Sequence, residues 1–327
     1  MDVLDAPPNR LGECPLWCNR TRRLWWVDVL EPSLWSYDPA AGRCTRHAVA
    51  ARRLGSIALL DGGGLLLACD DGLHAWDPST GAQTFLVDPE PSRPGHRKND
   101  GRSDSAGSFW VGTLREADYA PVGAIYRVAP DLVITRAFDG LAIPNALAFD
   151  PERRRLYFAD TRAYAISVCD HDPATGALGL PRIFARTTPP ARPDGSCLDA
   201  EGHLWNALYA GGRLVRYDPA GRISREIALP VSHPTCCAFG GPGLDRLYVT
   251  SASEPLTPAE RAAEPLAGRL LVLDPGVRGR PGCPAHFSRC LGARQPAIAR
   301  GTPGDRGRRD RGRGGGRRAA RRRVLPA

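Results

Sequence analysis

Short apolar or aromatic runs recur along the first 280 residues of the chain. Six share one form: Leu24–Asp28, Leu65–Asp70, Phe109–Thr113, Leu156–Asp160, His203–Leu208 and Leu247–Ser251. The last residues of successive runs are 42, 43, 47, 48 and 43 positions apart. A repeat of this length is typical of a four-stranded blade, so the pattern predicts an all-β fold, a six-bladed β-propeller, over about residues 8–280.

A second strand follows each run and ends in a turn that contains Asp, Pro or Gly. Leu34–Tyr37, for example, precedes Asp38-Pro39, and Leu214–Tyr217 precedes Asp218-Pro219. Such turns fit hairpins between consecutive antiparallel strands. A β-sandwich or two unrelated β domains are the alternatives, and the near-constant spacing favours the propeller.

The composition changes at residue 282. Residues 282–327 contain thirteen arginines and two aspartates, although the whole chain carries a net charge of only +9. Residues 1–281 are therefore slightly negative, which argues against a nucleic-acid-binding fold. The Arg/Gly-rich stretch has no strand-like alternation and predicts disorder. We expect a propeller over 1–281 and a disordered basic tail over 282–327 that binds polyanions without specificity or has no role, and whose deletion leaves activity intact.

The chain shows no membrane or export signal. No apolar run approaches the roughly 18 residues of a membrane span, and the first residues lack the basic and apolar regions of a signal peptide. We therefore expect a cytoplasmic protein without a membrane partner. Ten cysteines are scattered without any Cys-x-x-Cys pair, so neither a zinc ribbon nor a thioredoxin-type motif is present.

Polar residues recur at one position of the repeat. Glu13 and Asn145 lie 15 positions before the last residue of their runs, and Asp194 lies 14 positions before. Asn99 and Thr235 lie 14 and 16 positions before theirs. Because propellers bind ligands at one end of the ring, where equivalent loops meet, we expect these side chains to converge. A single loop acid or amide more often caps a turn, but the shared register favours a site.

The expected donors are carboxylate and amide oxygens. Such a set suits Ca²⁺, Mg²⁺ or Mn²⁺, and Zn²⁺ also accepts carboxylates. The pattern therefore predicts one divalent metal ion of open identity. Seven histidines share no short ligand spacing with one another, and only His96 is expected near the opening of the site.

Several segments together resemble the gluconolactonase and regucalcin (senescence-marker protein) family of six-bladed propellers. They are 11–17, 99–104 with 109–113, 143–149 with 156–161, 193–205 and 237–241. The resemblance implies hydrolysis of sugar lactones, with Glu13, Asn145 and Asp194 as ligands of the divalent metal. It implies further that Arg97 and Asn99 bind substrate and that Asp194 is the general base. Asp100 matches the motif and is open to a structural role.

The resemblance leaves the chemistry open at two points. Either Asp194 or the metal activates the attacking water. A phosphotriesterase-like hydrolase on the same scaffold and a calcium-binding propeller without catalysis are the alternatives to a lactonase. Cys14 and Ala146 stand where the family commonly has glycine, and we expect their extra bulk to narrow the site.

Overall fold

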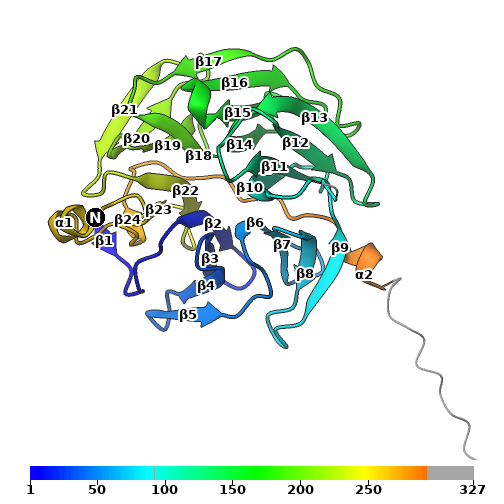
Figure 1. Cartoon of the computed structure of the whole chain (residues 1–327), viewed down its shortest axis with the longest axis horizontal. Helices are drawn as coiled ribbons and strands as arrows, with labels where there is room; N and C mark the ends of the chain where they lie inside the picture. Colours follow the sequence, from blue (N-terminus) through cyan, green and yellow to red (C-terminus); the bar gives the residue numbers. More distant parts are fainter. Residues whose placement is uncertain (92, 293–327) are drawn as a thin grey trace, which may run out of the picture. The chain divides into compact units, whose positions relative to one another are not determined.

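The computed structural model describes residues 1–91 and 93–292. In this part of the chain, six four-stranded antiparallel sheets form a ring, as Figure 1 shows. The predicted six-bladed β-propeller is therefore confirmed. We number the blades 1 to 6 in chain order, each from its innermost strand outward.

Five blades consist of four consecutive strands. Blade 1 contains β2 (Gly12–Cys18), β3 (Arg23–Asp28), β4 (Ser33–Asp38) and β5 (Arg43–His47). Blade 2 contains β6 (Leu54–Leu59), β7 (Leu65–Cys69), β8 (Gly72–Trp76) and β9 (Gln83–Val87). Blade 3 contains β10 (His96–Ser103), β11 (Phe109–Arg115), β12 (Gly123–Val128) and β13 (Ile134–Leu141). Blade 4 contains β14 (Pro144–Asp150), β15 (Arg155–Asp160), β16 (Ala165–Asp170) and β17 (Arg182–Arg186). Blade 5 contains β18 (Arg192–Leu198), β19 (Leu204–Tyr209), β20 (Arg213–Tyr217) and β21 (Ile223–Ala228).

Blade 6 combines strands from both ends of the described chain. Its inner strands are β22 (Pro234–Gly240), β23 (Arg246–Ser251) and β24 (Leu271–Leu273), and its outermost strand is β1 (Asp2–Val3). Figure 1 shows β1 beside β24, where Asp2 pairs with Val272. The N-terminal segment thus supplies the outer strand that the sequence pattern left undefined.

The helices are short. They are η1 (Thr161–Ala163), α1 (Pro258–Ala263) and α2 (Ser288–Gly292). Among the described residues, no helix has the length and apolar character needed to cross a membrane.

The apolar core lies within and between the blades. Trp26, Trp110 and Trp205 are fully buried on β3, β11 and β19, the second strands of their blades. Strands this short cannot bury both faces alone, so stacking each blade on its neighbours supplies the apolar burial that stabilises the ring.

A repeated aspartate fixes where the innermost strands begin. Asp28, Asp70 and Asp160 end or follow the second strand of their blades, and each carboxylate accepts two backbone N–H bonds from the chain that enters the innermost strand. These bonds run from Arg10 and Leu11, Arg52 and Arg53, and Ala142 and Ile143. The six innermost strands all begin at one face, which we name the top.

Each innermost strand carries a β-bulge near its start. The register shifts lie at Glu13/Leu16, Leu54/Ser56, Lys98/Gly101, Asn145/Ala148, Pro193/Ser196 and Pro234/Cys236. Bulges re-aim side chains and often lie beside active sites. Cys14 and Ala146 occupy two of these bulges with φ of 48° and 58°, in the left-handed region that favours glycine.

The opposite face, the bottom, is covered by the chain that follows blade 6. Ala285 pairs with Leu60, and Phe287 is fully buried in the apolar cluster of blades 2 and 3. The packed chain therefore extends past residue 281, where composition placed the end of the domain. Deletion from residue 282 removes core side chains, contrary to the expectation that 282–327 is dispensable. The predicted disorder of 293–327 lies outside the described residues.

Candidate active and metal-binding site

The residues predicted from the repeat lie at the bulges at the top of the ring. Glu13, Asn99, Asn145 and Asp194 belong to β2, β10, β14 and β18, the innermost strands of blades 1, 3, 4 and 5. Glu13 and Asn145 are the last paired residues before their bulges, and Asn99 and Asp194 lie one residue further, inside theirs, so the shared register corresponds to two adjacent structural positions.

A hydrogen-bond chain links three of these blades. Asn99 Nδ2 donates to Asn145 Oδ1 at 2.8 Å. Asn145 Nδ2 donates to Thr161 Oγ1 at 2.8 Å, and Thr161 Oγ1 donates to the Pro193 carbonyl at 2.9 Å, next to Asp194. This series of hydrogen bonds fixes the orientation of the Asn145 amide. It leaves Asn145 Oδ1 with a second lone pair for a ligand.

Three acidic side chains from three blades influence one another. Burial raises the pKa of Glu13 to about 8, and the charge of Asp100 contributes to the shift. Burial raises the pKa of Asp194 well above its ordinary value, and the charges of Glu13 and Asp100 add to it. Glu13 and Asp194 both lie near the start of an innermost strand, at the top of the ring, and charges that influence one another in this way act over short distances.

The two aspartates differ in their hydrogen bonds. Asp194 is 5% exposed, and its Oδ1 has no hydrogen-bond partner among the described residues. Asp100, in contrast, accepts from the backbone N–H groups of Gly101 and Leu147 at 2.9 and 2.8 Å. Asp100 therefore joins blades 3 and 4, whereas Asp194 has an oxygen available for a cation or a proton.

Arg97 connects the amide chain to an acid that the sequence pattern missed. Its Nη1 donates to Asn99 Oδ1 at 2.7 Å and its Nε donates to Glu116 Oε1 at 3.1 Å. Arg53 also donates to Glu116, at 3.0 Å. Glu116 follows β11, which is not an innermost strand, so the bulge register does not reveal it. A search for acids just after the second strand of each blade would have found it.

Two expected members point elsewhere. Thr235 lies at the bulge of β22, but its buried hydroxyl donates to the Gly12 carbonyl and lies 2.9 Å from Thr250 Oγ1, so it is not directed toward the other donors. His96 is largely buried, and its Nδ1 bonds Glu90 Oε2 at 3.0 Å instead of facing the opening of the site. Both side chains are held by structural partners that sequence spacing does not show.

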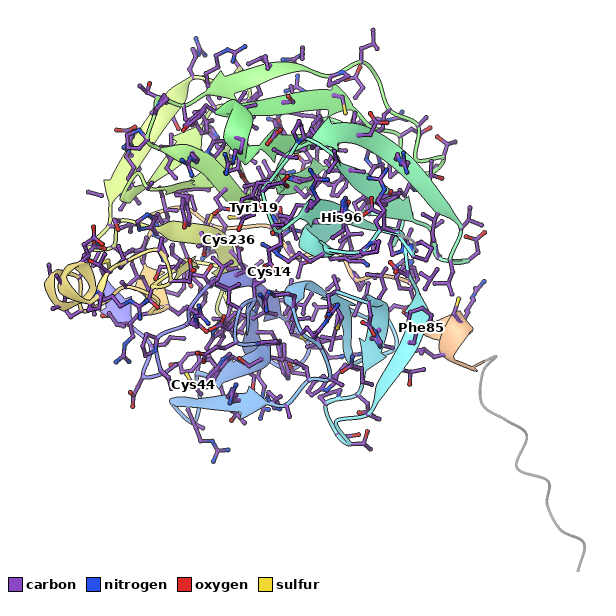
Figure 2. All side chains as sticks on the ribbon, in the orientation of Figure 1. Cys14, Cys44, Phe85, His96, Tyr119 and Cys236 are labelled. Carbon is purple, nitrogen blue, oxygen red and sulfur yellow. The ribbon has the colours of Figure 1, made fainter. Side chains whose placement is uncertain are left out.

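Cys14 is a structural residue. Its thiol is buried and bonds the backbone of Ile57, and burial raises its pKa to about 12. A thiol with so high a pKa is unreactive near neutral pH. Figure 2 shows Cys14 and Cys236 near the middle of the ring, with Tyr119 close to them in this view.

The axis below the site is crossed by Arg102. Its Nε donates to the Leu147 carbonyl at 3.3 Å and its Nη2 donates to the Ser196 carbonyl at 3.1 Å, joining blade 3 to blades 4 and 5. Below it, a cavity of about 130 Å³ opens at the bottom, lined in part by Phe149, Phe239 and Cys283. None of the predicted site residues lines this cavity.

The donors at the top fit a hard divalent cation. Glu13, Asn145 and Asp194 offer carboxylate and amide oxygens, and the partnerless Asp194 Oδ1 is a buried polar atom that requires a ligand. A separate group in blade 2, Cys69, Asp71 and His74, has donor atoms within 4.8 Å of one another. There, His74 Nε2 already bonds Asp71 Oδ1 at 2.9 Å.

Comparison with known proteins places this site in a family. Residues 11–253 match the family model described as SMP-30/Gluconolactonase/LRE-like region. An L-arabinolactonase from Azospirillum brasilense is 40% identical, over 81% of this chain and 88% of its own length. A regucalcin from Xenopus laevis is 31% identical, over 83% of this chain and 93% of its own.

A solved structure agrees with these sequences. The crystal structure of regucalcin from Agrobacterium tumefaciens, described as a calcium-binding protein, superimposes with a TM-score of 0.83 at 35% identity. The match covers 87% of this chain and 96% of that one. The resemblance read from the sequence is confirmed, and the predicted enzyme class agrees with the activity named for the arabinolactonase relative. The chain belongs to the SMP-30/gluconolactonase/LRE-like family.

Proposed function

We propose that the protein is a metal-dependent lactonase that opens sugar lactones to hydroxy acids. The observation that carries the proposal is the partnerless, buried Asp194 Oδ1 beside Glu13 and the Asn99–Asn145 amide pair. A buried acid without a partner is costly in a folded protein and is typical of functional sites. The arabinolactonase relative supports a sugar lactone as the substrate class.

Glu13, Asn145 and Asp194 would hold the divalent cation, whose identity among Ca²⁺, Zn²⁺, Mn²⁺ and Mg²⁺ is open. When bound, such an ion supplies Lewis acidity that polarises the ester carbonyl. Arg97 and Asn99 would orient the substrate. Hydrogen bonds to Glu116 and Asn145 hold these two side chains in place, so they offer the substrate fixed positions. Arg102 closes the axis below, so water approaches from the top.

Asp194 acts as the general base. It accepts a proton from the attacking water as the new C–O bond forms, the ring C–O bond breaks, and the proton passes to the departing ring oxygen. One lactone and one water thus give one hydroxy acid. Burial raises the pKa of Asp194 in the metal-free protein, and a bound divalent cation would lower it again, which would keep the carboxylate ionised for this role.

The test measures acid release from L-arabinono-1,4-lactone and D-glucono-1,5-lactone by metal-stripped protein supplied with each of the four cations. We expect turnover with at least one cation, and a fall in kcat of about 10²–10⁴-fold for Asp194→Asn. Asp131→Asn, in an exposed turn of blade 3, is the matched control. Equal rates for the wild type and Asp194→Asn would remove Asp194 from the mechanism.

Two alternatives give different results in the same assay. A calcium-binding propeller without catalysis, suggested by the regucalcin structure, would bind the cation but release no acid from either lactone. A phosphotriesterase-like hydrolase would act on an organophosphate ester faster than on both lactones. Either result would replace the lactonase proposal.

A further inference from the structure

Arginines are concentrated in one ring of positions at the top of the propeller. Each position directly precedes the last paired residue before the bulge, and the six hold Gly12, Arg53, Arg97, Pro144, Arg192 and His233. Because the six innermost strands begin side by side, these residues border the site formed by Glu13, Asn145 and Asp194. Three of the six are arginines.

Two of the three arginines share one carboxylate. Arg53 and Arg97 both donate to Glu116, at 3.0 and 3.1 Å. On the blade 2 and blade 3 side of the ring, this carboxylate therefore offsets one of the two positive charges and occupies the Nε group of both arginines.

Arg192 has no such partner. Its Nε donates to Tyr164 Oη at 3.3 Å and its guanidinium lies 5.8 Å from the centre of the Tyr164 ring. Within the described part of the chain it forms no salt bridge and no other side-chain hydrogen bond. Nε and the ring thus hold the guanidinium in place, while Nη1 and Nη2 remain available as the two-pronged donor that matches a carboxylate.

The surroundings of Arg192 place it beside the reaction site. It precedes Asp194 by two residues and pairs in register with Tyr209, whose ring packs edge-on against His233 at 4.6 Å. Burial raises the pKa of Tyr209, and the charge of Asp194 adds to the shift, so the phenol also lies near that carboxylate.

A second cation without a carboxylate partner lies on the same side. Arg162, in η1 of blade 4, lies 5.4 Å from the centre of the Tyr119 ring and forms no salt bridge with any described residue. Figure 2 shows Tyr119 near the middle of the ring. Two tyrosines thus support two guanidinium groups without a carboxylate partner, and Thr161, the neighbour of Arg162, donates to the carbonyl of Pro193 next to Asp194.

Building on the proposed lactonase activity, we propose that Arg192, assisted by Arg162, binds a carboxylate substituent on the substrate. The preferred substrates are then lactones of sugar diacids, in which an acidic group takes the place of the terminal hydroxymethyl group. Paired charge-assisted hydrogen bonds at this half-buried position favour the acidic lactone about tenfold.

The test compares two lactones that differ only at this substituent, D-glucaro-1,4-lactone with a carboxylate and D-glucono-1,4-lactone with a hydroxymethyl group. We expect kcat/KM to be higher for the acidic lactone in the wild type. Arg192→Gln lowers the acidic-to-neutral ratio about tenfold, chiefly through KM, and Arg192→Lys restores part of it. Arg182→Gln, exposed on β17, is the control and leaves the ratio unchanged.

Two outcomes separate this inference from the lactonase proposal. Hydrolysis of both lactones with a ratio that Arg192→Gln does not change overturns the carboxylate subsite and keeps the lactonase. If neither lactone is hydrolysed, calorimetric binding of D-glucarate and D-gluconate still decides. Glucarate binding that Arg192→Gln weakens supports the subsite, and equal binding by the two proteins contradicts it.

Discussion

The two faces of the propeller are built on opposite principles. At the top, buried acids from three blades lie together, Asp194 has an oxygen without a partner, and two arginines have no carboxylate. At the bottom, the chain after blade 6 fills the ring with apolar side chains such as Phe287. Apolar burial at the bottom stabilises the fold, which allows the top to keep groups that destabilise it until a ligand binds.

Phe287→Ala tests the stabilising face and has the largest expected effect. Phe287 is fully buried, so its truncation lowers the free energy of unfolding by about 3–5 kcal/mol in chemical denaturation. Ile223→Ala, exposed on β21, is the control and changes it by less than about 0.5 kcal/mol.

Two truncations extend this test. A chain that ends after residue 292 keeps Phe287 and should unfold like the full-length protein, whereas one that ends after residue 281 loses Ala285 and Phe287. Equal stability of the two truncated chains would contradict the role given to the bottom face.

Glu13→Gln tests the top face. In metal-free protein, burial raises the pKa of Glu13 from 4.5 to about 8, so the folded state keeps a proton that the unfolded state releases. The free energy of unfolding therefore falls as the pH rises from about 4.5 to about 8. Above that range the whole destabilisation caused by the buried Glu13 charge is present. Replacement by glutamine removes this loss and raises the melting temperature at pH 9 by at least about 3 °C.

The measurement is thermal unfolding from pH 5 to pH 9 with a chelator present. Glu31→Gln, an exposed acid in blade 1, serves as the control and should follow the wild type. If the melting temperatures of Glu13→Gln and the wild type change in parallel across this pH range, the buried charge of Glu13 does not destabilise the top face.

Ala146→Gly is expected to give the smallest effect. Glycine relieves the positive φ of 58° at this bulge, which offsets the loss of one buried methyl group, so the free energy of unfolding changes by less than about 1 kcal/mol. Ala148 is buried on the same strand, β14, and has no positive φ. Ala148→Gly therefore gains no such relief and should lower the free energy of unfolding more than Ala146→Gly does. A larger cost at Ala146, measured by urea unfolding, would show that its backbone is not strained.

Sequence patterns predicted most of the ring and part of the site. The blade period is visible because each second strand is a compact apolar run, and the shared register of Glu13, Asn145 and Asp194 follows from that period. β1 escaped detection because a two-residue strand has no pattern of its own. Phe287 lies just before the arginine-rich stretch in the sequence. The composition of that region predicted disorder, so the burial of Phe287 was not predicted. Thr235 shares the register, but its hydroxyl is occupied by contacts between blades that spacing cannot reveal.

The site's electrostatic partners depend on side-chain reach instead of register. Glu116 meets Arg53 and Arg97 only because two neighbouring blades place their arginines on either side of it. The stacking of Arg192 on Tyr164 similarly joins residues 28 positions apart in adjacent blades. The predicted metal identity and the cytoplasmic location stay predictions.

The pairing of β1 with β24 sets an order of events during synthesis. Asp2 and Val3 can pair with Val272 and Leu271 only after those residues have been synthesised. Blade 6 therefore stays incomplete until nearly the whole described chain has left the ribosome. Contacts this distant in sequence form slowly. A bulky fusion at the first residues should therefore hinder closure more than one attached at the other end.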